Sequence, residues 1–296
     1  MTSKYQNAIP RHWLRRLAIA PRRTVTWTIA GLLGAAALST AANQAKALDP
    51  KTTDPRQIAK AMEARDEGDH AQATVTLTLI DASGRKRVRK LRQQRIKFAG
   101  GHKTIMFFES PADVRNTGLL SIDYDDGSRD DDQWLYLPSL HKSTRIASVN
   151  KSDSFMGTDL TYADMTKTDT SAYEYKLLDG DAKVDGEACW LIEARPKTDK
   201  EKRETGYLKT QVWVSKDKLL PVQTKAWVLE GKKLKYMKAS EFTKIDGVWI
   251  AKRLAVRTVR NNKVESETLM EMANLKFNQP SITDDQFTER RLEQGL

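Results

Sequence analysis

From Gln72 onward the chain alternates apolar and polar residues with a period of two, which is the pattern of β-strands. Val75, Leu77 and Leu79 alternate with threonines, and residues 81–84 predict a turn into a second strand rich in Lys and Arg. Comparable runs follow, separated by turn sequences. Strands are predicted at 104–108, 119–124, 134–137, 142–146, 173–178, 189–194, 207–214, 222–229, 234–242, 249–259 and 264–277, with turns at 179–180, 185–186, 230–231, 246–247 and 261–262.

The pattern predicts a single helix, near the start of this region. Pro55 follows Asp54, and Ile58, Ala59 and Met62 recur at helical spacing, so a short amphipathic helix is expected to end near residue 65. Many consecutive hairpins predict an antiparallel meander. A lone sheet needs an apolar layer against one face, so this mainly β fold is expected to curve into a barrel or half-barrel.

Several predicted strands carry large apolar residues on both faces. One face could form the core while the other lines a cavity, or a helix or loop could cover the second face. Because a shift of one residue exchanges the two faces of a strand, the face of each side chain stays open. The candidates for the cavity wall are Trp134, Tyr136, Trp213, Trp227, Trp249, Met270 and Met272.

The stretch after residue 150 is polar and contains glycine, yet it also carries large apolar side chains. Phe155 and Met156 are adjacent, and Tyr162 follows closely. Large apolar groups on a loop are expected to cover another apolar surface. Phe155, Met156 and Tyr162 are therefore candidates for a lid that binds ligand, and the alternative is that they plug the barrel end as permanent core.

The first 47 residues have the features of an export signal. Arginines precede an apolar stretch at 24–38, and Ala45-Lys46-Ala47 gives the small-x-small pattern of a cleavage site. The apolar stretch is shorter than the roughly 20 residues of a spanning helix. Since Cys189 is the only cysteine in the sequence, no lipid-anchoring cysteine follows the cleavage site. We expect a cleaved signal at 1–47, exported by the Sec or the Tat route, and one soluble domain at 48–296.

Removal of this leader changes the charge. Residues 1–47 hold seven Lys or Arg and no Asp or Glu, so the net charge falls from +11 to +4. Binding to nucleic acid thereby loses its main support, and no nucleic-acid partner is expected. The basic strand at 85–95 is interpreted as a solvated face, with docking to an acidic partner or to lipid headgroups as the alternative.

Signatures of catalysis and of metal binding are missing from the sequence. It contains no HExxH, CxxC, GxSxG or Walker-type motif, and His70, His102 and His141 are far apart in sequence. The acidic run at 123–132 does not have the spacing of a calcium loop and is interpreted as a solvated hairpin turn. We expect no enzyme activity, no metal and no cofactor.

Four segments together resemble the outer membrane lipoprotein-sorting protein family, which is similar to the lipoprotein carriers LolA and LolB. These segments are 107–113 (FFESPAD), 118–120 (GLL), 134–138 (WLYLP) and 154–165 (SFMGTDLTYADM). The resemblance implies a half-open β-barrel with a few covering helices, whose concave apolar side holds acyl chains. It also implies the periplasm of a Gram-negative cell, and it brings no catalytic residue with it.

The expected function is that of a periplasmic carrier. It would hold a lipid or lipoprotein acyl chain in a concave apolar cavity and transfer it between membranes, with peripheral or transient membrane contact. As the resemblance implies, an inner-membrane transporter of the resistance-nodulation-division type could be its partner. Two alternatives stay open: a periplasmic lipid sensor or transporter adaptor without carrier turnover, and an enzyme that modifies lipid or envelope polymer.

Overall fold

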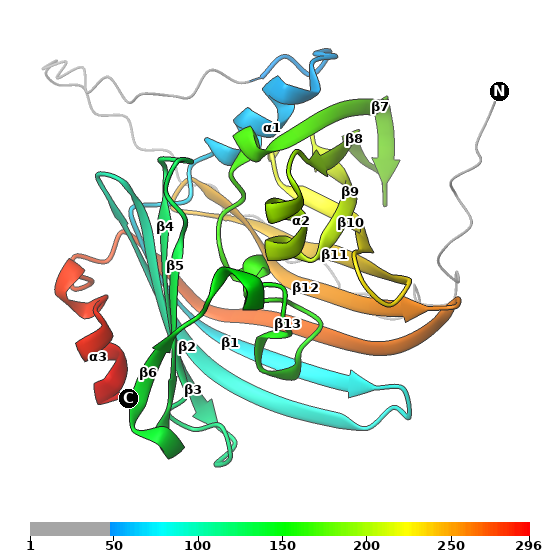
Figure 1. Cartoon of the computed structure of the whole chain (residues 1–296). Helices are drawn as coiled ribbons and strands as arrows, with labels where there is room; N and C mark the ends of the chain where they lie inside the picture. Colours follow the sequence, from blue (N-terminus) through cyan, green and yellow to red (C-terminus); the bar gives the residue numbers. More distant parts are fainter. Residues whose placement is uncertain (1–47) are drawn as a thin grey trace, which may run out of the picture. The chain divides into compact units, whose positions relative to one another are not determined.

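A computed structural model describes residues 48–296, so the predicted export signal at 1–47 lies outside the described residues. The chain forms one antiparallel sheet of 13 strands in the order β6-β5-β4-β3-β2-β1-β13-β12-β11-β10-β9-β8-β7. The sheet is strongly curved and open, with β6 and β7 at its two edges (Figure 1). The predicted antiparallel meander is therefore confirmed, with the addition that β1 pairs with β13.

The predicted strands are present, and most are longer than the pattern indicated. Pro138 follows the last residue of β5 and ends that strand, because proline has no N–H for the ladder. The strands are β1 (His70–Asp81), β2 (Lys86–Phe98), β3 (Gly101–Ser110), β4 (Gly118–Tyr124), β5 (Asp132–Leu137), β6 (Lys142–Arg145), β7 (Tyr173–Val184), β8 (Glu187–Pro196), β9 (Tyr207–Ser215), β10 (Pro221–Val228), β11 (Lys233–Ile245), β12 (Val248–Arg260) and β13 (Lys263–Phe277).

One predicted turn, at Asp179-Gly180, is wrong. These residues lie within β7, where the pairing with β8 is irregular between Leu177 and Ala182. The Asp179 carboxylate accepts a hydrogen bond from the Asp181 backbone N–H at 2.8 Å. A local side-chain contact of this kind suits a bulge as well as a turn. The chain reverses instead at the second predicted position, Asp185-Gly186, where both residues have positive φ.

The predicted helix is α1 (Pro55–Glu63), and the Asp54 side chain caps its first turn by accepting from the N–H groups of Arg56 and Gln57. Ile58 and Ala59 are fully buried against Trp190, Ile192 and Val214 of the sheet. Two further helices, α2 (Asp199–Thr205) and α3 (Glu289–Gln294), have six or seven residues. The family resemblance implied a few covering helices, but the hydrophobic pattern did not locate these two. Such short helices leave little periodic signal.

Neighbouring residues on the strands separate into two layers, one on each side of the sheet. Met106, Phe108 and Leu119 belong to a core cluster on the concave side. Phe107 and Leu120 belong to a second cluster on the opposite side, which the C-terminal segment covers with Ile282, Phe287 and Leu292. Figure 1 shows α3 on that outer side of β4 and β5. Side chains alternate along a strand, so each apolar strand here supports two layers.

The segment between β6 and β7, residues 146–172, crosses the concave side of the sheet (Figure 1). It consists of short 3-10 turns joined by irregular chain, as at Phe155–Gly157 and Ala163–Met165. Phe155 inserts into the concave core cluster. We call residues 146–172 the covering segment.

Candidate functional site

A buried aromatic side chain holds the covering segment against the concave side of the sheet. Phe155 is 1% exposed and packs in the cluster with Val75, Leu77 and Leu91. Its ring centroid lies 5.9 Å from that of Phe108 and 5.7 Å from that of Tyr162. Met156 and Tyr162 are partly buried against the same cluster. The three predicted lid residues are thus together on the concave side, and whether they open stays a prediction.

A buried carboxylate also fastens the covering segment to the sheet. Asp159 is 6% exposed, and its carboxylate accepts from Thr258 Oγ1 at 2.5 Å, Thr268 Oγ1 at 2.7 Å and the hydroxyl of Ser266. The backbone N–H of Asp159 donates to Thr268 Oγ1 at 2.9 Å. Hydrogen bonds to ionised groups are about twice as strong as neutral ones. We call Asp159 and these three hydroxyl residues the Asp159 anchor.

Further polar contacts hold the covering segment at other points. The Tyr207 hydroxyl donates to the Asp164 carboxylate at 2.9 Å. Burial and this carboxylate raise the pKa of Tyr207 well above its ordinary value, so the phenol stays protonated and can donate. Gln133 Nε2 donates to the Tyr162 carbonyl at 3.0 Å, and the Arg89 guanidinium donates to the Met156 carbonyl.

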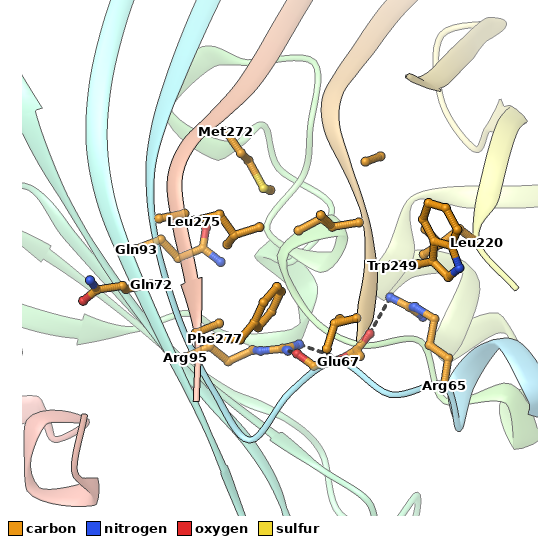
Figure 2. A pocket seen from close by; sticks show the side chains of 15 residues that line it. Arg65, Glu67, Gln72, Gln93, Arg95, Leu220, Trp249, Met272, Leu275 and Phe277 are labelled. Atoms are coloured by element: carbon orange, nitrogen blue, oxygen red, sulfur yellow. Dashed lines mark hydrogen bonds and ion pairs between the residues drawn. The ribbon is translucent and has the colours of Figure 1, made fainter. Parts of the chain in front are cut away.

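A cavity of about 270 Å³ remains on the concave side, beyond the covering segment. It lies where β1, β2, β12 and β13 meet the chain that leaves α1. Figure 2 shows its lining, with Met272 at one end and a charged group of residues at the other. The lining is mostly apolar and comprises Arg65, Glu67, Ala71, Gln72, Ala73, Gln93, Arg95, Leu220, Val248, Trp249, Ile250, Ala251, Met272, Leu275 and Phe277.

Two arginines and one glutamate form the charged end of the cavity. Arg95 Nη1 donates to Glu67 Oε2 at 2.6 Å, and Arg65 also pairs with the Glu67 carboxylate. Arg95 in addition donates to the Glu67 carbonyl, and Arg65 Nη1 to the Met62 carbonyl at 2.8 Å. Although burial opposes ionisation, the two guanidinium groups keep the pKa of Glu67 below its ordinary value. We call Arg65, Glu67 and Arg95 the charged triad.

The basic strand at 85–95 is only partly the solvated face that its composition suggested. Arg89 and Arg95 share the inward side of β2 with Leu91. Arg89 contacts the covering segment, and Arg95 pairs with Glu67 of the charged triad. Lys90 and Arg92 point to the outer side and are exposed. The alternation along β2 therefore places two of its arginines in the concave interior.

The structure brings some predicted wall residues to the cavity and places others elsewhere. Met272 and Trp249 line the cavity, and Met270 packs against the concave core cluster. Trp134 and Tyr136 pack on the outer side with Leu292 of α3. They therefore lie apart from the cavity.

The two remaining tryptophans lie on the outer side of the sheet as well. Trp213 packs against the cluster of Leu191 and Val222, on the face opposite its neighbour Val214, which contacts α1. The Trp227 ring lies 4.4 Å from the Lys209 ammonium group and 4.7 Å from that of Lys225. These cation–π contacts account for Trp227 without a bound ligand.

A second buried carboxyl group, that of Asp123, lies near Arg95 and Glu67 of the charged triad. Asp123 is 7% exposed and accepts from the Lys167 backbone N–H at 3.2 Å. Burial, together with the carboxylate of Asp131, raises its pKa to about 7. Asp123 was predicted to belong to a solvated turn. The rest of that acidic run is the expected turn between β4 and β5.

Replacing Asp123 with asparagine is expected to flatten the pH dependence of stability. In the unfolded chain an Asp has a pKa of about 3.9. The folded protein keeps a proton that the unfolded chain releases, so wild-type stability falls as the pH rises from about 4 to about 7. The free energy of unfolding is measured with urea at pH 5 and at pH 8. Between these pH values, the difference between the variant and wild type should shift by about 1–3 kcal/mol in favour of the variant. Asp125→Asn, in the exposed part of the same turn, is the control, and equal pH dependence in all three proteins would contradict the prediction.

The described part of the chain gives no support for a catalytic or metal-binding role of a histidine. Burial and the nearby Arg95 lower the pKa of His102. Within residues 48–296, neither His102 nor His141 forms a side-chain hydrogen bond with a carboxylate, and no group of three or more His, Cys, Asp or Glu could hold a metal ion. The expectation of no enzyme activity stays a prediction. None of the described helices has both the length and the apolar composition needed to cross a membrane.

The charged triad and the Asp159 anchor were not predicted from sequence. Arg95 shares its strand parity with Leu91, which was a signal that it points inward. Asp159 stands among Phe155, Met156 and Leu160, and a carboxylate within such an apolar stretch was a sign of a specific partner. Two of its partners, Ser266 and Thr268, lie more than a hundred residues away along the chain, so only the fold identifies them as partners of Asp159.

Comparison with known proteins places this arrangement in a family. A family model described as "Uncharacterized protein" matches residues 100–294. A search of the curated proteins gave no match. Among solved structures, one described as an outer membrane lipoprotein-sorting protein domain from Vibrio parahaemolyticus is 29% identical, with a TM-score of 0.72 over 81% of this chain and 98% of that one.

Two further structures agree. A DUF1329 family protein from Desulfovibrio piger is 28% identical, with a TM-score of 0.72 over 81% of this chain and all of its own. A LolA superfamily protein from Nitrosomonas europaea, 19% identical, has a TM-score of 0.61 over 81% of this chain and 100% of that one, which shows the same fold. The chain is similar to the outer membrane lipoprotein-sorting protein domain and to the DUF1329 protein, and its open curved sheet has the fold of the LolA superfamily protein. It belongs to the family whose model matches residues 100–294.

Proposed function

We propose that the protein is a periplasmic carrier that holds an acyl chain of a lipid or lipoprotein on the concave side of its sheet. The observation that carries the proposal is the largely apolar cavity of about 270 Å³ between β1, β12 and β13. It is supported by the lipoprotein-sorting name of a 29% identical structure. Burial of each CH₂ group contributes about 0.8 kcal/mol, so a few methylene groups give useful affinity.

The covering segment limits how much of an acyl chain can be buried. Phe155 already occupies the centre of the concave core, so the cavity beyond it accepts only part of a long chain unless the segment moves. Partial burial suits a carrier, because a fully buried long chain would bind too tightly for transfer. In this proposal, larger cargo enters by competing with Phe155, Met156 and Tyr162 for the same apolar surface.

Transfer also requires donor and acceptor membranes. The proposal includes the periplasm as the location, peripheral or transient contact with a membrane, and an inner-membrane transporter of the resistance-nodulation-division type as the partner. Cross-linking in cells followed by purification of the exported protein tests the transporter. Recovery of the carrier without a transporter of this type would remove that partner from the proposal and leave the acyl site intact.

A substitution that fills the cavity tests the acyl site itself. Ala71 lines the cavity, and Ala71→Trp should lower the affinity for a fluorescent fatty acyl probe by at least about tenfold, since it removes the space for several methylene groups. Ala255, on the outer face of β12, provides the matched control Ala255→Trp, which should bind the probe as wild type does. Circular dichroism verifies that both variants fold.

The wild-type protein provides the decisive negative result. The exported form is purified from its membrane-containing source and extracted with organic solvent. If mass spectrometry detects no lipid in the extract and the purified protein takes up no acyl probe, the carrier function is excluded.

A further inference from the structure

The cavity combines an apolar wall with a charged end, which is the arrangement of a site for an amphiphile. Leu220, Val248 and Met272 belong to the apolar wall. The charged triad lies at the opposite end from Met272, with its three side chains directed toward one another (Figure 2). An acyl chain alone needs only the wall. The charged end requires a separate explanation.

The charged triad carries an excess of positive charge in a buried place. Its side chains are 28%, 17% and 19% exposed for Arg65, Glu67 and Arg95. These are the only charged residues among those that line the cavity, so two guanidinium groups face one carboxylate. Burial of an uncompensated charge costs free energy, and a second anion next to the two arginines would remove that cost.

The surrounding groups supply only part of that second anion at neutral pH. Behind Arg95 lie His102, whose pKa is lowered so that the imidazole stays neutral, and Asp123, whose pKa of about 7 leaves it partly protonated. Asp125 pairs with Lys167 at 4.0 Å. The positive excess therefore persists at the cavity end.

The two arginines also retain hydrogen-bonding capacity. Their contacts with Glu67 and with the Met62 carbonyl occupy only part of the N–H groups of two guanidiniums. Arginine presents these donors in a planar fork that matches the oxygens of a carboxylate or a phosphate. The free donors and the missing negative charge favour the same kind of ligand group.

We infer that the ligand of this cavity is an anionic single-chain amphiphile, whose carboxylate or phosphate head binds Arg65 and Arg95 while its acyl chain lies along Leu220, Val248 and Met272. The inference rests on the proposed acyl-binding function and adds the charge of the head group to it. Glu67 then holds the two guanidinium groups in place and restrains their affinity for the head.

Three ligands with the same acyl chain separate the contributions. Binding of a fatty acid, a lysophosphatidic acid and a neutral monoacylglycerol is measured by titration calorimetry below the concentration at which each forms micelles. Wild type should bind at least one of the two anionic ligands about tenfold more tightly than the neutral one. A preference between the fatty acid and the lysophosphatidic acid identifies the head as carboxylate or phosphate.

Variants of the charged triad test the assignment of the head group. Arg95→Gln should reduce the affinity for the anionic ligand about tenfold and leave the neutral ligand unchanged. Arg92→Gln is the matched control, because Arg92 is on the same strand but faces outward and is 49% exposed. Glu67→Gln removes the carboxylate that competes with the head, so it should tighten binding of the anionic ligand about threefold or more. This gain cannot result from misfolding.

The outcomes distinguish this inference from the proposed function. If wild type binds the neutral ligand as tightly as both anionic ones, or if neither Arg95→Gln nor Glu67→Gln changes the preference, the anionic head group is refuted while acyl binding stands. If wild type binds none of the three ligands, the proposed function fails and the inference fails with it.

Discussion

Phe155→Ala is expected to lower the free energy of unfolding by about 3–5 kcal/mol, the usual cost of truncating a fully buried phenylalanine. The side chain is 1% exposed and contacts the rings of Phe108 and Tyr162, so its removal leaves a void in the centre of the concave core. Urea unfolding monitored by tryptophan fluorescence measures this loss. The result bears directly on whether the covering segment is an integral part of the core.

Val149→Ala serves as the control for this measurement. Val149 is in the same covering segment but is 71% exposed, so its truncation should change the free energy of unfolding by less than about 0.5 kcal/mol. If Phe155→Ala were as mild as Val149→Ala, Phe155 would contribute nothing to global stability and the segment would behave as a detached lid.

Asp159→Ala should be nearly as damaging, with an expected loss of about 3 kcal/mol, since hydrogen bonds to charged groups contribute about 1.5–3 kcal/mol each and do not add fully. The substitution leaves the hydroxyls of Thr258, Ser266 and Thr268 without their common acceptor on the concave face. Chemical denaturation provides the measurement. Limited proteolysis should in addition cut the covering segment earlier than in wild type, because its anchor to β12 and β13 is gone.

The hydroxyl side of the same network supplies the controls. Thr268→Val removes one of the three donors and should cost less than Asp159→Ala. In the Asp159→Ala background, Thr268→Val should then cost less than in wild type, because only the hydrogen bond from the backbone N–H of residue 159 to Thr268 Oγ1 remains to be lost. Full additivity of the two changes would show that Asp159 does not act through these hydroxyls.

The strand pattern could be predicted from sequence because alternation with a period of two is a local signal. The face that each strand presents could not, since it depends on a register fixed by partners far along the chain. Trp213 and Trp227 illustrate this: both are large and aromatic, yet both lie on the outer side of the sheet. Met272, which lines the cavity, has no sequence feature that separates it from them.

The charged residues of the site could not be predicted from sequence for a related reason. Arg95 is one of many basic residues on β2, and Glu67 is separated from it by 28 positions, so only the fold brings them together. Composition suggested a solvated strand, because charged side chains are rarely buried without a partner. Arg95 does have a partner, Glu67, but the local sequence does not identify it.

The open sheet leaves two edge strands whose backbone groups could pair with another molecule, and both edges have features that oppose aggregation. β6 has only four residues, Lys142–Arg145, with a positive charge at each end. β7 is interrupted by pairing irregularities between Leu177 and Ala182. Short, charged or bulged edges are poor templates for intermolecular sheet growth. A chain whose concave side we propose to hold apolar cargo thereby has edges that resist self-association.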